Sequence, residues 1–184
     1  MRSSKLHAAT GFAPGRVPFP VLHVDTGHNF PEVIRFRDET VARLGIDLEV
    51  ARVQDYIDDG RLAERPDGTR NPLQTQPLLD AIAAGRHDAV FGGARRDEAP
   101  TRAETELVVW DARNGLVKVN PVAAWSFDDL IDYATVHEVP VNPLIATGYP
   151  SIGCAPCTRP VAPGEDPRSG RWAGLTKTEC GLHV

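Results

Sequence analysis

The sequence contains little sulfur: it has 3 cysteines, and its single methionine is Met1. An odd number of cysteines fits a disulfide-stabilised fold poorly. Thiols that cluster, as at Cys154, Cys157 and Cys180, are instead typical of metal binding or redox chemistry in a reducing compartment. The chain also lacks an apolar run near the roughly 18 residues of a membrane helix, and its first residues lack the apolar segment of a signal peptide. We therefore expect a cytoplasmic protein that does not contact a membrane.

An excess of positive charge is absent as well. Lysine and arginine number 20, aspartate and glutamate 25, and the formal net charge is −5. Proteins that bind nucleic acid normally carry a basic excess, so we expect no nucleic-acid partner. The net charge does not exclude a local basic pocket that binds a small anion. With 184 residues, 41% of them hydrophobic, the chain is long enough to bury the core of one globular domain.

Strand and helix patterns alternate along the first 147 residues. Strands are predicted at 20–25, 47–53, 88–92 and 115–119, and helices at 31–44, 77–84 and after Ser126, with a polar loop at 58–72. This alternation predicts an α/β fold built on a parallel sheet, over residues 1–147. From residue 148 the chain is rich in proline and glycine, so 148–184 is predicted to be an irregular, cysteine-containing tail.

Three polar motifs follow predicted strands: Asp25-Thr26-Gly27, Gly92-Gly93-Ala94-Arg95-Arg96 and Asn120-Pro121. Ligands of open α/β sheets bind beyond the carboxyl ends of the strands. Glycines permit a close backbone approach, and arginines bind phosphate or sulfate oxygens in a bidentate manner. The first motif could hydrogen-bond a ribose or an adenine edge. The alternative is that these motifs are only polar strand ends and a basic surface turn.

Two cysteine motifs lie in the C-terminal part. Cys154-Ala155-Pro156-Cys157 and Cys180-Gly181-Leu182-His183 together have the composition of a tetrahedral zinc site, and the alternative is a pair of free thiols in a loop. Cys180 also has Lys177 and His183 nearby, and cations lower the pKa of a thiol and make it nucleophilic.

Two further cations, Arg168 and Arg171, could hold an anionic substrate near this thiol. The alternative is a solvated surface tail, because Glu165, Asp166 and Glu179 partly cancel these charges.

The motifs as a set resemble two related families. Residues from about 98 to 184, with Tyr149-Pro150-Ser151-Ile152-Gly153-Cys154 and Glu179-Cys180-Gly181-Leu182-His183, resemble assimilatory adenylyl-sulfate/phosphoadenylyl-sulfate reductases. Residues 11–98, with Val24-Asp25-Thr26-Gly27-His28 and Gly92-Gly93-Ala94-Arg95-Arg96, resemble the small subunit of sulfate adenylyltransferase. Both families have the Rossmann-like fold of the adenine-nucleotide α-hydrolase-like superfamily, and the resemblance implies that fold here.

The resemblance also implies a reaction. Cys180 would attack the sulfur of adenylyl sulfate or 3′-phosphoadenylyl sulfate and carry sulfite as a thiosulfonate, which thioredoxin or a similar dithiol would release. Cys154 and Cys157 would be two of the four ligands of a [4Fe-4S] cluster. The implied substrate-binding residues are Asp25, Thr26, Gly27, Gly92, Gly93, Arg95, Arg96, Arg102, Lys118, Arg168, Arg171, Lys177 and His183. A homo-oligomer is left open.

Two departures from the reductase pattern accompany the resemblance. The region that corresponds to the second cysteine pair of the cluster-containing reductases reads Arg70-Asn71-Pro72 here. The N-terminal Ser-Gly-Gly-Lys-Asp-Ser type of phosphate loop is not found, so the expected domain is N-terminally truncated, with its first strand missing. Two alternatives therefore stay beside the reductase: a sulfate adenylyltransferase small-subunit-like protein, and an inactive fragment with a structural metal knot.

Overall fold

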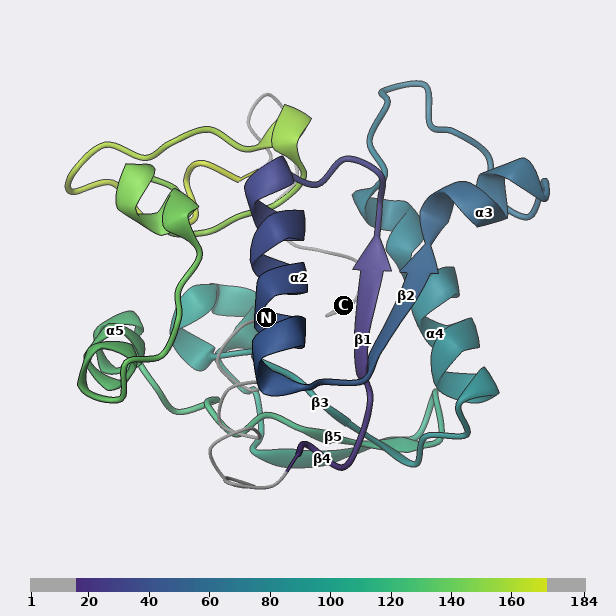
Figure 1. The fold of residues 1–184 in the computed structure, drawn as a ribbon, viewed down its shortest axis with the longest axis horizontal. Helices are drawn as coiled ribbons and strands as arrows, with labels where there is room; N and C mark the ends of the chain where they lie inside the picture. Colours follow the sequence, from purple (N-terminus) through teal and green to yellow (C-terminus); the bar gives the residue numbers. More distant parts are fainter. Residues whose placement is uncertain (1–15, 172–184) are drawn as a thin grey trace. The chain divides into compact units, whose positions relative to one another are not determined.

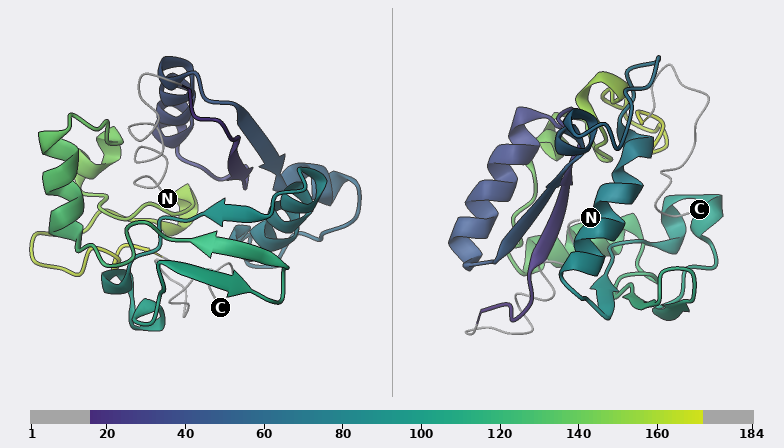
Figure 2. Two further views of the ribbon diagram at one scale, coloured as in Figure 1. Left: turned by 90° about the horizontal axis from the view of Figure 1, so that it is seen from below. Right: turned by 90° about the vertical axis from the view of Figure 1, so that its right-hand side faces the viewer.

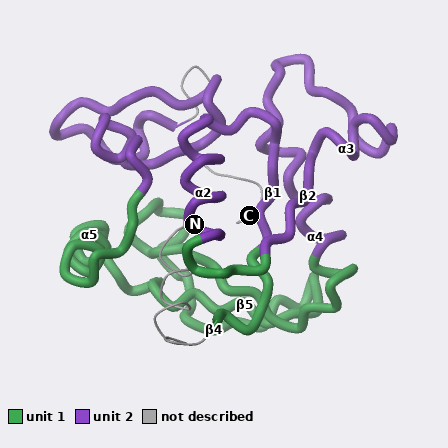
Figure 3. The backbone as a smooth tube through the Cα atoms, viewed as in Figure 1, with its two compact units in different colours: residues 1–21, 43–47, 82–141 green, residues 22–42, 48–81, 142–184 purple. Residues whose placement is uncertain are grey.

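A computed structural model describes residues 16–171 of the chain (Figure 1). Contacts within this part group into two compact units, drawn in separate colours in Figure 3. Unit 1 takes in residues 43–47 and 82–141, with the segment up to Val21, and unit 2 takes in 22–42, 48–81 and the segment from Asn142 onward. None of the helices in residues 16–171 has the length and apolar character that crossing a membrane requires. The division into an α/β domain over residues 1–147 and a tail over 148–184 stays a prediction.

Unit 2 contains most of the first strand–helix–strand sequence. It consists of β1 (Val21–Asp25), α2 (Pro31–Leu44) and β2 (Leu48–Arg52), where β1 and β2 are neighbours in a two-stranded sheet. The two strands run in the same direction, with α2 beside them (Figures 1 and 2). As predicted, α2 begins at Pro31 and is followed by Gly45, whose φ of 57° suits a residue without a side chain.

Further short helices complete the described part of unit 2. These are α3 (Val53–Asp58), the 3₁₀ turns η1 (Asn71–Gln74), η4 (Pro143–Thr147) and η5 (Ala155–Cys157), and the first residues of α4 (Thr75–Ala84). Val53, which opens α3, is fully buried, and so is the side chain of Asn142, which caps η4 by accepting a hydrogen bond from the backbone of Leu144. The chain from 142 to 171 is thus held by turns rather than by long elements.

Unit 1 is built on a three-stranded sheet of order β3-β5-β4. The pairing of β3 (Ala89–Phe91) with β5 (Leu116–Val119) is parallel, as predicted. The pairing of β4 (Val108–Asp111) with β5 is antiparallel, with Trp110 opposite Val117. Helix α5 (Phe127–Val136) begins at Ser126, whose side chain accepts a hydrogen bond from the backbone N–H of Asp129 at 3.1 Å.

The sequence-based prediction missed one α-helix and one strand, in addition to the 3₁₀ turns. Helix α3 was not predicted, although the chain from Asp59 up to Arg70 does form the expected loop before η1. Strand β4 was not predicted either, because its residues do not alternate in polarity and only its pairing with β5 defines it. The predicted strands at 20–25, 47–53, 88–92 and 115–119 are all present, and each is one or two residues shorter than predicted.

Candidate functional site

The turn after β1 is a closed hydrogen-bonded structure. The carboxylate of Asp25 accepts hydrogen bonds at 2.8 Å from the backbone of Gly27 and from the side chain of Asn29. Thr26 is 2% exposed, and its hydroxyl accepts a hydrogen bond from the backbone of His28 at 3.1 Å. Gly27 has a φ of 75°, in the left-handed region that favours glycine. The Asp25-Thr26-Gly27 motif therefore has a defined shape before any ligand binds.

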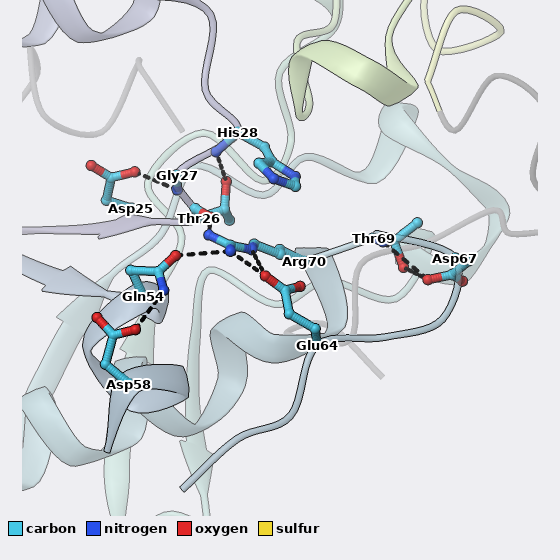
Figure 4. A network of polar contacts seen from close by, with 10 residues as sticks. All are labelled: Asp25, Thr26, Gly27, His28, Gln54, Asp58, Glu64, Asp67, Thr69 and Arg70. Atoms are coloured by element: carbon cyan, nitrogen blue, oxygen red, sulfur yellow. Dashed lines mark hydrogen bonds and ion pairs between the residues drawn. The ribbon is translucent and has the colours of Figure 1, made fainter. Parts of the chain in front are cut away.

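Arg70 anchors this turn from the loop before η1 (Figure 4). Its guanidinium, 10% exposed, donates to the backbone carbonyl of Thr26 at 3.0 Å and to the side chain of Gln54 at 2.8 Å. It also forms a hydrogen-bonded ion pair with Glu64, and this interaction lowers the pKa of the Glu64 carboxyl. A Cβ at Gly27 would lie 2.7 Å from Nη1 of Arg70, so glycine is required for this close packing.

Cys154 lies against the same turn. It is 4% exposed, and its Sγ donates a hydrogen bond to Oδ1 of Asn71 at 3.2 Å and lies 3.6 Å from the hydroxyl of Thr26. The backbone N–H of Ala155 donates to the carbonyl of His28 at 2.7 Å. The structure thus brings together the strand-end motif and the cysteine motif, which are 128 residues apart at the Thr26–Cys154 contact.

These surroundings test whether the cysteine turn fits a cluster. Within residues 16–171, no group of three or more His, Cys, Asp or Glu side chains is placed to hold a metal ion. The Cys154 sulfur contacts the amide oxygen of Asn71 and lies near the hydroxyl of Thr26, and neither of these groups is a cluster ligand. The described residues therefore do not fit a four-cysteine [4Fe-4S] site. A zinc site would have to draw on Cys180 and His183, which lie outside the described residues.

The arginine-containing segment before residue 172 packs on the cysteine turn. Thr158 and Arg171 form an isolated antiparallel bridge, and the backbone N–H of Arg159 donates to Gly170 at 2.9 Å. A Cβ at Gly153 would lie 3.5 Å from Nε of Arg171, so this guanidinium lies beside the start of the turn. The backbone N–H of Arg168 donates to Asp166 at 2.6 Å. Arg171 is thereby placed next to Cys154 and Cys157 within unit 2.

The basic loop after β3 forms a separate cluster in unit 1. Arg95, which is 9% exposed, pairs with Asp97 at 2.9 Å and with Glu98 at 3.6 Å. Arg102, which is 8% exposed, also pairs with Glu98. Arg96 instead donates from Nε to the carbonyl of Thr105 at 2.8 Å. Two buried guanidiniums thus share one carboxylate, which fixes both arginine side chains close to the β3 strand end.

The backbone at the end of β3 is equally constrained. The N–H of Gly92 donates to the carbonyl of Val119 at 2.8 Å, and a Cβ at Gly92 would lie 2.6 Å from Oδ1 of Asn120. Asn120 in turn donates from its side chain to the carbonyl of Glu106 at 3.0 Å. Glycine at position 92 is therefore explained by this close approach of the Asn120 side chain.

Lys118, another predicted substrate-binding residue, lies on β5. Its ammonium forms an ion pair with the carboxylate of Asp111 at 2.6 Å. This hydrogen bond, together with those from Asn114, lowers the pKa of Asp111 from 3.8 to about 2. Lys118 therefore has a carboxylate partner within its own hairpin.

The predicted site residues thus fall into two groups. Unit 2 holds Asp25, Thr26, Gly27, Cys154, Cys157, Arg168 and Arg171, and unit 1 holds Gly92, Gly93, Arg95, Arg96, Arg102 and Lys118. Lys177, Cys180 and His183 lie outside the described residues. Sequence reasoning did not identify Arg70, Asn71 and Glu98 as site residues. The resemblance marked Arg70 and Asn71 only as the region of the missing cysteine pair. Glu98 is a polar residue of the short 3₁₀ turn η2 (Arg96–Glu98), and no periodicity or spacing marks it.

Comparisons with known proteins agree with this architecture. Residues 6–160 match the family model described as phosphoadenosine phosphosulfate reductase domain. A protein of Rhodococcus opacus (strain B4) named adenosine 5′-phosphosulfate reductase is 45% identical, over 97% of this chain and 73% of its own length. A protein of Streptomyces lavendulae named sulfate adenylyltransferase subunit 2 is 52% identical, over 73% of this chain and 50% of its own length.

Solved structures show the same fold. A phosphoadenylyl-sulfate reductase from Candida auris superimposes with a TM-score of 0.61 at 24% identity, over 76% of this chain and 72% of that one. An FMN adenylyltransferase from Candida glabrata reaches a TM-score of 0.61 at 16% identity, over 77% of this chain and 45% of that one.

The fold and these comparisons define a Rossmann-like α/β protein, as the sequence predicted. The chain belongs to the phosphoadenosine phosphosulfate reductase domain family. The expected resemblance to sulfate adenylyltransferase small subunits is confirmed beside it.

Proposed function

We propose that this chain reduces adenylyl sulfate, or its 3′-phosphorylated form, to sulfite in assimilatory sulfate reduction. The observation that carries the proposal is the 45% identity, over 97% of this chain, with a relative named adenosine 5′-phosphosulfate reductase. The geometry supports it with a preformed polar turn after β1 and with two buried arginines after β3. A hydrogen-bonded polar turn suits an adenosine, and arginines suit an anionic phosphosulfate.

The proposed chemistry begins at Cys180. Its thiolate attacks the sulfur of the substrate, an S–S bond forms, and AMP (or adenosine 3′,5′-bisphosphate) leaves with the electron pair of the broken O–S bond. One thiol of thioredoxin, or of a similar dithiol, then attacks the Cys180 sulfur and displaces sulfite. The second thiol of that dithiol releases Cys180 and leaves the dithiol oxidised to a disulfide. Because this cycle needs reduced thiols, we propose that it takes place in the cytoplasm.

Within this proposal, the arginines donate hydrogen bonds to the sulfonate and the phosphate. Arg95, Arg96 and Arg102 would do so after β3, and Arg168 and Arg171 beside the cysteine turn. Lys177 and His183 flank Cys180 in the sequence and would favour its thiolate form. The described part of the chain provides the ordered arginines, and the reacting thiol lies beyond it.

The direct test measures sulfite. The full chain is incubated with adenylyl sulfate and separately with its 3′-phosphorylated form, together with thioredoxin, thioredoxin reductase and NADPH. We expect sulfite release with one of the two, and a sulfur trioxide adduct on Cys180 when thioredoxin is omitted. Cys180→Ser should abolish both, because a hydroxyl cannot replace a thiolate at its ordinary pKa. Sulfite release that persists in Cys180→Ser, or an adduct on Cys154 or Cys157, would contradict the proposal.

A second candidate function has one observation in its favour. The 52% identity with a protein named sulfate adenylyltransferase subunit 2 exceeds the identity with the reductases, although it covers 73% of this chain. The candidate activity is formation of adenylyl sulfate from ATP and sulfate. Sulfate-dependent exchange of labelled pyrophosphate into ATP, without sulfite release from adenylyl sulfate, would favour this function over reduction.

A further inference from the structure

We propose that Cys154 and Cys157 form a reversible dithiol–disulfide pair that exchanges with small disulfides such as glutathione disulfide. This goes beyond the proposed reductase function, which uses Cys180 as its thiol. The starting point is the misfit described above: in residues 16–171 the cysteine turn has no third metal ligand beside it. Two neighbouring thiols that do not bind a metal can react with disulfides by thiol–disulfide exchange.

The backbone of the turn brings the two cysteines within disulfide distance. The N–H of Cys157 donates to the carbonyl of Cys154 at 3.1 Å, which closes a four-residue turn. Such turns bring their first and last Cα atoms within about 7 Å, and disulfides span Cα distances of about 4.4–6.8 Å. Residues 155–157 form the 3₁₀ turn η5, and Cys154 is its N-cap residue, so the two cysteines lie at the two ends of one short turn. Closing the bond therefore requires little movement of the backbone.

The two thiols differ in environment. Cys154 is 4% exposed, and its S–H is held by the neutral amide oxygen of Asn71. Cys157 is half-buried, so a disulfide from solution can reach it first. We therefore assign Cys157 as the attacking thiol and Cys154 as the resolving thiol. Asn71 is a positioning residue, because it acts on the pair only through the S–H of Cys154.

The reaction balances in two exchange steps. The thiolate of Cys157 attacks one sulfur of glutathione disulfide, forms a mixed disulfide, and releases one glutathione thiolate. Cys154 gives its proton to that thiolate or to water, attacks the Cys157 sulfur, and displaces the second glutathione. The two protein thiols lose two electrons and two protons in total, and one glutathione disulfide becomes two glutathione molecules.

The test is thiol trapping in the full chain. Protein purified under reduced, anaerobic conditions is equilibrated with glutathione and glutathione disulfide in defined ratios, quenched with acid, alkylated, and digested with trypsin. Cleavage after Lys118 and Arg168 leaves Cys154 and Cys157 in one peptide, and cleavage after Lys177 places Cys180 in another. We expect that, under oxidising ratios, the first peptide is two hydrogens lighter than its thiol form and takes up no alkyl group.

Two single variants distinguish the assigned roles. Cys154→Ser should stop after the first step and accumulate a glutathione adduct on Cys157. Cys157→Ser should leave the buried Cys154 to react at least about tenfold more slowly, since thiol susceptibility follows exposure. Asn71→Leu should preserve the disulfide and shift its equilibrium with glutathione, which a merely structural role would not do.

Three results would overturn the proposal. The first is a 154–157 peptide that stays fully reduced when glutathione disulfide is in excess. The second is a disulfide that joins either residue to Cys180. The third is stoichiometric iron or zinc that protects both thiols in the anaerobically purified protein. These readouts do not depend on sulfite release. Failure of the proposed cysteine pair is therefore distinguishable from failure of the proposed reductase activity.

Discussion

The Sγ atom of Cys154 lies 3.2 Å from Oδ1 of Asn71. By the resemblance described above, Asn71 belongs to the region that corresponds to the second cysteine pair of the cluster-containing reductases. Its amide also accepts a hydrogen bond from the side chain of Gln74 at 2.7 Å. The chain thus satisfies a buried thiol with a neutral hydrogen-bond network.

This relationship leads to a first prediction about metal binding. Replacing both residues, in Arg70→Cys/Asn71→Cys, adds two thiols next to Cys154 and completes a set of four cysteines. We expect the variant to bind iron and sulfide on anaerobic reconstitution, with a visible absorption band that the unaltered chain lacks. Iron analysis and circular dichroism on the same sample separate metal binding from loss of fold.

The matched control for this metal test is the same double variant that also carries Cys154→Ser, which should bind far less iron. Equal iron in the unaltered chain and in the double variant would refute the assignment of the Asn71 position.

The second prediction concerns Arg70. Arg70→Ala removes hydrogen bonds to Thr26 and Gln54 and the ion pair with Glu64. Because the Thr26 carbonyl and the turn after β1 lose a buried donor, we expect unfolding to become easier by about 2–3 kcal/mol. Urea unfolding followed by circular dichroism measures this change.

Arg65→Ala provides the control, because Arg65 and its partner Asp67 are 44% and 42% exposed. Its cost should stay below about 1 kcal/mol. Equal costs for the two variants would show that the Arg70 network contributes no more than a surface pair.

The third prediction concerns Glu98, which pairs with both Arg95 and Arg102. Glu98→Ala leaves two guanidiniums, 11% and 9% exposed, without this carboxylate. Removing one partner from a buried ion pair costs about 3–5 kcal/mol, and we expect a destabilisation at the lower end of this range because Arg95 keeps Asp97. Thermal and urea unfolding provide the measurement.

The exposed pair of Arg159 and Glu165 supplies the comparison for Glu98, since these side chains are 47% and 41% exposed. Glu165→Ala should cost less than about 1 kcal/mol. A Glu98→Ala protein as stable as Glu165→Ala would mean that the two arginines are solvated rather than held by Glu98.

The fourth prediction concerns acid stability. Folding lowers the pKa of Asp111 from 3.8 to about 2, chiefly through its hydrogen bond with Lys118. A lowered carboxyl pKa stabilises the folded state fully above pH 3.8, and the stabilisation disappears as the pH falls towards about 2. The stability advantage of the unaltered chain over Asp111→Asn should therefore be constant near neutrality and shrink across that window.

A second variant tests the cause of this Asp111 shift. Lys118→Met removes the cation, so the pKa of Asp111 should rise towards 3.8, as followed by the NMR titration of its carboxyl carbon. An unchanged Asp111 titration in Lys118→Met would show that the Asn114 hydrogen bonds, and not the lysine, cause the shift.

Local sequence signals were sufficient for many of the elements. Pro31 and Gly45 mark the bounds of α2, and Ser126 with Asp129 marks the start of α5, because capping depends on residues a few positions apart. Strand β4 could not be predicted in this way. Its residues alternate in exposure, but the exposed ones are the apolar Val108 and Trp110, at 59% and 61%. Polarity therefore does not follow exposure in this strand, and its pairing with β5 defines it.

The sequence by itself determined the family, the α/β class, the polar strand ends and the spacing of the cysteines, since these depend on residue types and local order. Only the tertiary structure decided what faces the cysteines and the strand end. Arg70 reaches Thr26 across 44 residues, and Asn71 meets Cys154 across 83. Such contacts follow from the packing of buried elements and from the need to pair buried polar groups, and no local pattern encodes them.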